Sequence, residues 1–157
     1  MPSPSTKAEA LRIGLVSDTH DLLRPEVLDY LYGSDHIVHA GDICGDAVLE
    51  TLRSLAPLTV VRGNNDRGAW AGSLPEQATV RLGGVAVHVV HDLKDLLLPG
   101  GVRVVVSGHS HKPRVQERDG VLYVNPGSAG PRRFQLPISA GELRIAGGEV
   151  TVQLQSF

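Results

Sequence analysis

The sequence has few of the features that mark secreted, membrane or nucleic-acid-binding proteins. Cys44 is the single cysteine among 157 residues, so the chain has no internal disulfide and no metal site built from several thiolates. A net charge of −2 gives no support to a protein that binds nucleic-acid backbone. No apolar run approaches the length of a membrane span. We therefore expect no membrane association and, by default, a cytoplasmic location.

The chain also lacks linkers, repeats and low-complexity segments that would divide it. Residues 1–10 contain Pro and Ser but no apolar core, which predicts a loose tail rather than a signal peptide or an anchor. Residues 11–157 suffice for a respectable core, and a hydrophobic content of 41% is ordinary for a globular protein. We expect one domain over 11–157.

The first half of the chain alternates apolar runs with helix-like segments. Apolar runs predict strands at 11–16, 36–40 and 58–61. Pro25 and Gly33 delimit a predicted helix, whose apolar stripe is Val27, Leu28, Leu31 and Tyr32. Asp46 can cap a second helix, whose core-facing residues are Val48, Leu49, Leu52 and Leu55. This alternation is typical of parallel βαβ units.

The second half predicts strands joined by tight turns. Gly83-Gly84, Arg118-Asp119-Gly120 and Gly147-Gly148 each lie between two apolar runs, as in β-hairpins. Residues 102–106 read as a buried strand, and the segment 92–101 before it is too short for a well-formed crossover helix. The simplest architecture is an α/β fold of two packed sheets with helices outside.

Oxygen and nitrogen ligands follow the predicted strands, each at the point where a strand ends. They are Asp18, His20, Asp42, Asn64, His91, His109 and His111. Such ends gather at one edge of an α/β sheet, where ligands bind. Carboxylate and amide oxygens mixed with imidazole suit Mn²⁺, Fe or Zn²⁺. Seven ligands exceed what one ion can use, which predicts two ions, about 3.5–4 Å apart in enzymes that attack phosphorus.

The sequence allows either a functional or a structural role for several other polar residues. Asp66 either orients His20 or a metal-bound water, or caps a turn. Arg132 and Arg133 either clamp a phosphate or are a solvated pair, the latter slightly favoured. The remaining histidines lie in or beside apolar strands and read as structural; they are His36, His39 and His88.

Five motifs in order carry a resemblance to a known family. They are Asp18-Thr19-His20, Gly41-Asp42, Gly63-Asn64-Asn65-Asp66, His91 and Gly108-His109-Ser110-His111. The chain resembles the calcineurin-like metallophosphoesterases, and its short length with Asn125-Pro126-Gly127-Ser128 looks like the small, YfcE-type phosphodiesterase branch. The resemblance implies a four-layer sandwich of two mixed sheets flanked by helices. It covers nearly the whole chain from Leu11 onward.

The resemblance also implies a dinuclear metal centre. One ion would be held by Asp18, His20, Asp42 and His111, and Asp42 would bridge to a second ion completed by Asn64, His91 and His109. The expected cofactors are two divalent ions, Mn²⁺ first, with Fe, Ni²⁺ or Zn²⁺ as alternatives. The catalytic group would comprise Asp42, Asn64 and His109, with a metal-bridging hydroxide attacking a small phosphodiester. Asn65, Arg132 and Arg133 are candidate substrate contacts.

Two positions depart from the family pattern. Asn65 stands where the superfamily often has a histidine proposed to act on the leaving group, so the resemblance assigns no general acid to this position. Asp92 stands where the family often has glycine, which affects the shape of the substrate site. Alternative functions are a phosphomonoesterase and a non-enzymatic interaction module resembling the retromer subunit. The sequence leaves open whether the chain forms a homo-oligomer.

Overall fold

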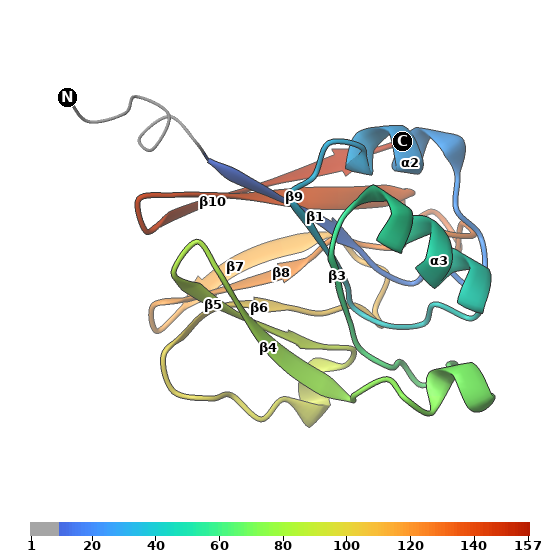
Figure 1. The fold of residues 1–157 in the computed structure, drawn as a ribbon, viewed down its shortest axis with the longest axis horizontal. Coiled ribbons are helices and arrows are strands. Elements are labelled where there is room, and N and C mark those ends of the chain that lie inside the picture. The colour runs from blue at the N-terminus through green and yellow to red at the C-terminus, as the bar shows by residue number, and fades with distance from the viewer. Residues whose placement is uncertain (1–9) are drawn as a thin grey trace.

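A computed structural model describes residues 10–157 and shows two stacked β-sheets with helices on one side (Figure 1). Apart from residue 10, the loose tail expected over 1–10 lies outside the described residues. Each sheet has five strands and contains both parallel and antiparallel pairs. The predicted α/β sandwich of two mixed sheets is therefore confirmed.

The first sheet combines the parallel strands of the first half with the C-terminal hairpin. Its strands are β1 (Leu11–Val16), β2 (His36–His39), β3 (Leu58–Val60), β9 (Ser139–Ala146) and β10 (Glu149–Ser156). Their order is β10-β9-β1-β2-β3, with β1, β2 and β3 parallel. The parallel strands end at the same edge, so the loops that follow β1 and β2 are neighbours.

The second sheet is built from the hairpins and the buried strand of the second half. Its strands are β4 (Gln77–Leu82), β5 (Val85–Val90), β6 (Val102–Val106), β7 (Arg114–Arg118) and β8 (Val121–Asn125). Their order is β4-β5-β6-β8-β7, and β5, β6 and β8 are parallel. Between β5 and β6 the chain forms only the 3₁₀ turn η2 (Leu93–Asp95), as the short segment predicted.

Both α-helices pack on the outer face of the first sheet (Figure 1). They are α2 (Pro25–Leu31) and α3 (Asp46–Leu55), and a 3₁₀ turn η1 (Ala69–Ala71) precedes β4. On the second sheet, the outer residues Val102 and Val105 are covered by Leu96 of the β5–β6 loop, and no α-helix of the described chain lies there. The first sheet is therefore covered by two α-helices, whereas the second sheet is covered by the β5–β6 loop. No helix of the described residues is long and apolar enough to cross a membrane.

The two sheets share one apolar layer. Alternate residues of β1 and β2, such as Ile13, Leu15 and Val38, meet Val87 and Val104 of the second sheet. The strands β5 and β6 are buried on both faces, which explains their near-continuous apolar sequence. This shared core fixes the two sheets against each other and so places their strand ends side by side.

Two local predictions for the helices were wrong. Tyr32 is 75% exposed, because α2 ends at Leu31 and the chain becomes extended at Tyr32. Asp46 does not cap α3: Gly45 occupies the N-cap position and no side chain makes a cap hydrogen bond there. Asp46 instead lies in the first turn of α3, where its negative charge interacts favourably with the positive end of the helix dipole.

Candidate metal centre

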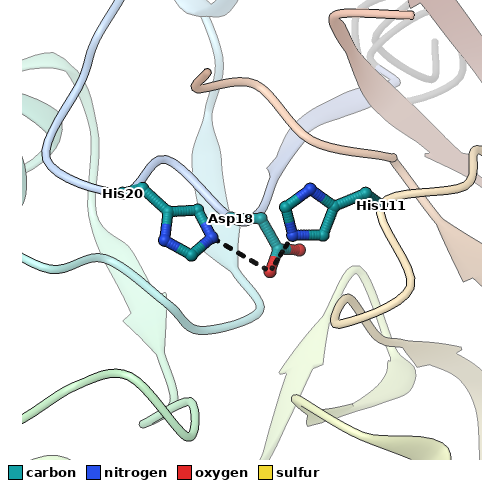
Figure 2. Close-up of side chains that lie close together, drawn as sticks. All are labelled: Asp18, His20 and His111. Carbon is teal, nitrogen blue, oxygen red and sulfur yellow. Dashed lines mark ion pairs between the residues drawn. The ribbon is translucent and has the colours of Figure 1, made fainter. Parts of the chain in front are cut away.

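The side chains predicted to bind metal lie where parallel strands of both sheets end. Asp18 and His20 follow β1, Asp42 follows β2, His91 follows β5, and His109 and His111 follow β6. Figure 2 shows Asp18, His20 and His111 pointing toward one another, although His111 is far from the other two in the sequence. The sandwich thus assembles one site from segments of both sheets.

The loops that carry these residues are tightly bent. Nine non-glycine residues of the described chain have a left-handed backbone, and five of them are predicted ligands: Asp18, His20, Asp42, His109 and His111. This conformation is costly for residues with a Cβ and clusters at functional sites. The concentration of strain at these five positions indicates a functional site in these loops.

Two overlapping groups of side chains could each hold a metal ion. The first is Asp18, His20 and His111, in which Asp18 Oδ1 lies 4.0 Å from His20 Nε2 and 3.4 Å from His111 Nε2. The second is Asp18, Asp42 and His91, in which His91 Nε2 lies 3.4 Å from Asp42 Oδ2 and 3.9 Å from Asp18 Oδ1. Asp18 belongs to both groups, so it is a second candidate for the bridge that the sequence assigns to Asp42.

Buried atoms without partners test whether these residues suit a cation. Among residues 10–157, Asp18 Oδ1, His20 Nε2 and His91 Nε2 are buried and make no hydrogen bond. Leaving such atoms unpaired costs about 1–3 kcal/mol each, so native proteins seldom do it without a reason. All three atoms belong to the two groups described above. A divalent cation would satisfy them together, and the residues therefore fit a metal centre.

The protonation states also suit metal binding. Burial lowers the pKa of His20, which favours the neutral imidazole that coordinates metals. Burial alone would raise the pKa of Asp42, but the neighbouring His91 ring and the hydrogen bonds from Asn65 hold it well below its usual range. For His91, burial by itself would lower the pKa, but the neighbouring carboxylates of Asp42 and Asp18 raise it above its usual value. A cation that binds here therefore meets an ionised carboxylate and competes with protons for His91.

Asp66 braces the loops that carry Asp42. Its Oδ2 accepts the backbone N–H groups of Asp42 at 2.9 Å and Gly63 at 2.8 Å, and its Oδ1 accepts that of Cys44 at 2.8 Å. Asp66 is only 6% exposed. Of its two sequence-based readings, neither describes it fully, because it ties the β2–α3 loop to the β3 loop rather than capping a single turn or touching His20.

Asn65 clamps the carboxylate of Asp42. Its backbone N–H donates to Asp42 Oδ1 at 2.9 Å and its side-chain Nδ2 donates to Asp42 Oδ2 at 3.0 Å. Gly63 lies against the same carboxylate, and a Cβ at position 63 would overlap Asp42 Oδ1. These contacts fix the direction of the Asp42 side chain. The role of Asn65 as a substrate contact stays a prediction.

His39 lies beneath the site and has a structural role. The Gly41 N–H donates to His39 Nδ1 at 3.1 Å, so the proton of the neutral ring lies on Nε2, 3.0 Å from Thr19 Oγ1. The Thr19 hydroxyl then donates to the carbonyl of Ile43 at 3.1 Å. This chain of bonds joins the β1–α2 and β2–α3 loops. Complete burial lowers the pKa of His39 to about 4, which keeps the ring neutral.

Two predicted ligands lie outside both groups. Asn64 is exposed, and its side chain makes no hydrogen bond to another described residue. His109 is half-exposed, and its Nε2 lies 3.5 Å from Asp92 Oδ2, although its ring stands 5.2 Å from that of His91. Arg132 and Arg133 are exposed on the loop after Ser128, and the charge of Arg133 contributes to lowering the pKa of His20. Their assigned roles stay predictions.

Two cavities open beside the site, and Asp92 lines both. One, of about 460 Å³, begins at His109 and continues over the outer face of β7 and β8. The other, of about 620 Å³, is lined by Asn64 and His91 and continues toward Glu76. We did not predict either cavity. The sequence carries a signal for the first cavity, the alternation of Arg114, Gln116 and Arg118, which places all three on one face of β7.

Comparisons with known proteins agree with this geometry. The model of the calcineurin-like phosphoesterase superfamily domain matches residues 11–148. A probable metallophosphoesterase of Methanothermobacter thermautotrophicus is 32% identical over 157 aligned positions, which cover 90% of each chain.

Two solved structures share the fold at lower identity. Vacuolar Protein Sorting 29 of Cryptosporidium parvum is 20% identical, with a TM-score of 0.75 over 94% of this chain and 98% of that one. A predicted phosphoesterase of Streptococcus pneumoniae is 23% identical, with a TM-score of 0.71 over 94% of this chain and 90% of that one.

Proposed function

Because the chain belongs to the calcineurin-like phosphoesterase superfamily, we propose that it is a phosphodiesterase that depends on two divalent metal ions. One ion would bind Asp18, His20 and His111, and the other Asp42, His91, Asn64 and His109, with the carboxylate of Asp42 or Asp18 shared between the two ions. Mn²⁺ is the first candidate, since carboxylate and imidazole ligands suit it. A cytoplasmic location is part of the proposal.

The observation that carries the preference for diesters is the pair of cavities. A phosphodiester has two substituents on its phosphate, whereas a monoester has one. Asp92 lines both cavities, and it directly follows His91 in the chain while its Oδ2 lies 3.5 Å from His109 Nε2. A phosphate at the metal centre could therefore extend one substituent into each cavity. A monoesterase would need only one of them.

The residues of the chain would divide the work as follows. Asp18, Asp42 and the histidines hold the ions, while Asn65 and Asp66 keep Asp42 in one orientation. Two bound ions would supply Lewis acidity toward the phosphoryl oxygens and would lower the pKa of the attacking water. Asn64 and His109 reach the mouth of the site, where they can donate hydrogen bonds to a phosphate oxygen.

A metal-and-substrate panel tests the proposal. Protein stripped by a chelator is assayed with bis(p-nitrophenyl) phosphate and p-nitrophenyl phosphate in Mn²⁺, Ni²⁺, Mg²⁺ or Zn²⁺. We expect metal-dependent hydrolysis that is faster for the diester. The His111→Ala variant should lose it, whereas His36→Ala, which removes a histidine bonded to Thr59 away from the site, should keep it. Faster hydrolysis of the monoester would favour a phosphomonoesterase instead.

A second candidate is a non-enzymatic interaction module of the same fold. The similarity to Vacuolar Protein Sorting 29 favours it, as do the large exposed apolar side chains Leu97 (75% exposed) and Phe134 (92%). Against it stands the intact group of ligands with unpartnered buried atoms. A flat response to every metal and both substrates in the panel would support the module and overturn the phosphodiesterase.

A further inference from the structure

The cavity that begins at His109 has a chemical character of its own. We propose that it binds one ester substituent of the substrate and selects a substituent that carries a second phosphate group. This inference rests on the proposed phosphodiesterase function and names the substrate class of that site. We call the cavity the basic pocket and define it by Lys112, Arg114, Arg118, Tyr123 and its entrance residue His109.

Three cations line the basic pocket without carboxylate partners. Within residues 10–157, no Asp or Glu oxygen lies within 4.0 Å of a side-chain nitrogen of Lys112, Arg114 or Arg118. Asp92, the carboxylate that lines the pocket, already faces Lys94 Nζ at 3.7 Å and His109 Nε2 at 3.5 Å. Unpaired cations gathered in a recess attract anions, and arginine matches the oxygens of a phosphate with two parallel hydrogen bonds.

The cations form a row that starts at the metal centre. Arg114 pairs across the ladder with Asn125, and Asn125 Nδ2 donates to the carbonyl of Gly108 at 3.0 Å. Lys112 follows directly after His111, and its N–H donates to Ser110 Oγ at 3.2 Å. Arg114 and Arg118 are four residues apart on one strand, a spacing of about 13 Å. The near end of the pocket is thus fixed to the histidine loop, within reach of a substituent on the scissile phosphate.

The far end of the pocket offers a flat surface. The guanidinium carbon of Arg118 lies 5.3 Å from the ring centroid of Tyr123, which is the geometry of a cation–π contact. Leu93 and Leu96 of the β5–β6 loop supply an apolar wall. The volume, about 460 Å³, lies in the range of small-molecule sites. A substituent with a ring and a phosphate would therefore find partners for both groups.

The other cavity has the opposite charge, which sets the orientation of the substrate. It is lined by Glu76, Asp92 and Asp95, and its arginine, Arg62, is paired with Glu76 Oε1 at 3.1 Å. A second phosphate placed there would face carboxylates and be repelled. The anionic substituent therefore enters the basic pocket, and the remaining substituent enters the acidic cavity.

A matched pair of substrates tests this selection. Thymidine 5′-(p-nitrophenyl phosphate) and its 3′-phosphorylated derivative share one leaving group and differ by one phosphate. With metal-loaded protein, we expect kcat/KM to be at least about tenfold higher for the 3′-phosphorylated substrate, since a charge-assisted contact contributes that much or more. The variant Lys112→Gln/Arg114→Gln should bring the ratio near one. The matched control Arg53→Gln removes an exposed charge from α3 and should keep the ratio.

A binding measurement removes catalysis from the test. Metal-loaded protein is titrated calorimetrically with thymidine 3′,5′-bisphosphate and with thymidine 5′-monophosphate, neither of which contains a diester bond. The bisphosphate should bind more tightly, and the double variant should abolish the difference while Arg53→Gln retains it.

The outcomes separate this inference from the proposed function. If neither thymidine ester is hydrolysed but the bisphosphate still binds through Lys112 and Arg114, the phosphodiesterase proposal fails and the anion-binding pocket stands. If both esters are hydrolysed at equal rates, or the double variant leaves the preference unchanged, the pocket does not select a second phosphate and the inference is overturned. Circular dichroism and thermal melting of each variant verify that it is folded.

Discussion

The two halves of the site differ in burial and in bracing. The half from the first sheet contains Asp18 and Asp42, which are 0% and 2% exposed, and Asp66, Asn65 and His39 hold its loops together. In the half from the second sheet, His91 and His111 are also buried, each 5% exposed, but His109 has 46% of its side chain exposed and adjoins an open cavity. A rigid, buried half suits the holding of ions, because ligands fixed in advance lose little entropy on binding. The open edge at His109 suits a substrate that must enter and leave.

The largest effect should come from removing the carboxylate that both candidate groups share. We expect Asp18→Asn to lose both metal ions and to lower activity more than about 100-fold, beyond the usual cost of changing residues that support ligands. Metal content is measured by elemental analysis of the dialysed protein. His109→Ala, from the open half, should retain at least one ion.

The same measurement on Asp42→Asn decides which carboxylate bridges. Loss of both ions in this variant supports the bridge that the sequence predicts for Asp42. If Asp18→Asn still holds two ions per chain, Asp18 is not shared, and the contrast between the halves breaks down.

The next effect is on stability and comes from His39 in the braced half. Its folded pKa of about 4 lies below the unfolded value of 6.5, so the unfolded chain binds the proton more readily. The stabilisation is complete above pH 6.5 and is lost as the pH falls toward 4, by about 3 kcal/mol at most. Urea unfolding of metal-free protein at pH 7 and pH 4.5 measures it. His39→Gln should reduce this difference; an unchanged difference would show that other groups cause it.

A smaller effect is expected from the brace at Asp66. Asp66→Ala leaves three backbone N–H groups without their acceptor and frees the Asp42 loop. Metal affinity should fall about 10- to 100-fold, as is usual for residues that orient ligands. Isothermal titration with Mn²⁺ gives the affinity, and Asp46→Ala, on the first turn of α3, serves as a matched control. Equal affinities in the two variants would mean that the brace does not act on the metal centre.

The smallest effect distinguishes two adjacent asparagines. Asn65→Ala removes one hydrogen bond to Asp42, so Mn²⁺ affinity should fall by about tenfold or less. If Asn64 is a metal ligand, as the sequence predicts, Asn64→Ala should lower the Mn²⁺ affinity more than Asn65→Ala does. The exposed side chain of Asn64 has no other partner among the described residues, so its loss should affect nothing else. A change confined to Asn65→Ala would remove Asn64 from the ligand set.

The order of the strands and helices could be predicted from the sequence alone. The apolar runs at 11–16 and 102–106 coincide with β1 and β6, and the hairpin at Gly83-Gly84 joins β4 to β5 as expected. These elements depend on local patterns of apolar residues and turn-forming glycines, which a single sequence displays directly. The predictions that Tyr32 faces the core and that Asp46 caps α3 were wrong. The ends of a helix depend on how the chain enters and leaves it, which the periodicity of apolar residues does not show.

The sequence by itself determined which residue types follow each strand, and these residue types indicate the chemistry of a metal centre. The same residues, in order, carry the resemblance of the chain to its family. Only the tertiary structure decided that Asp18 belongs to both ligand groups, that His109 faces Asp92, and that Lys112 and Arg114 border an open cavity. The physical reason is the separation along the chain between the residues that make each contact. Strands and turns arise from contacts between near neighbours, whereas a site built across two sheets depends on the register of strands and the packing of a shared core.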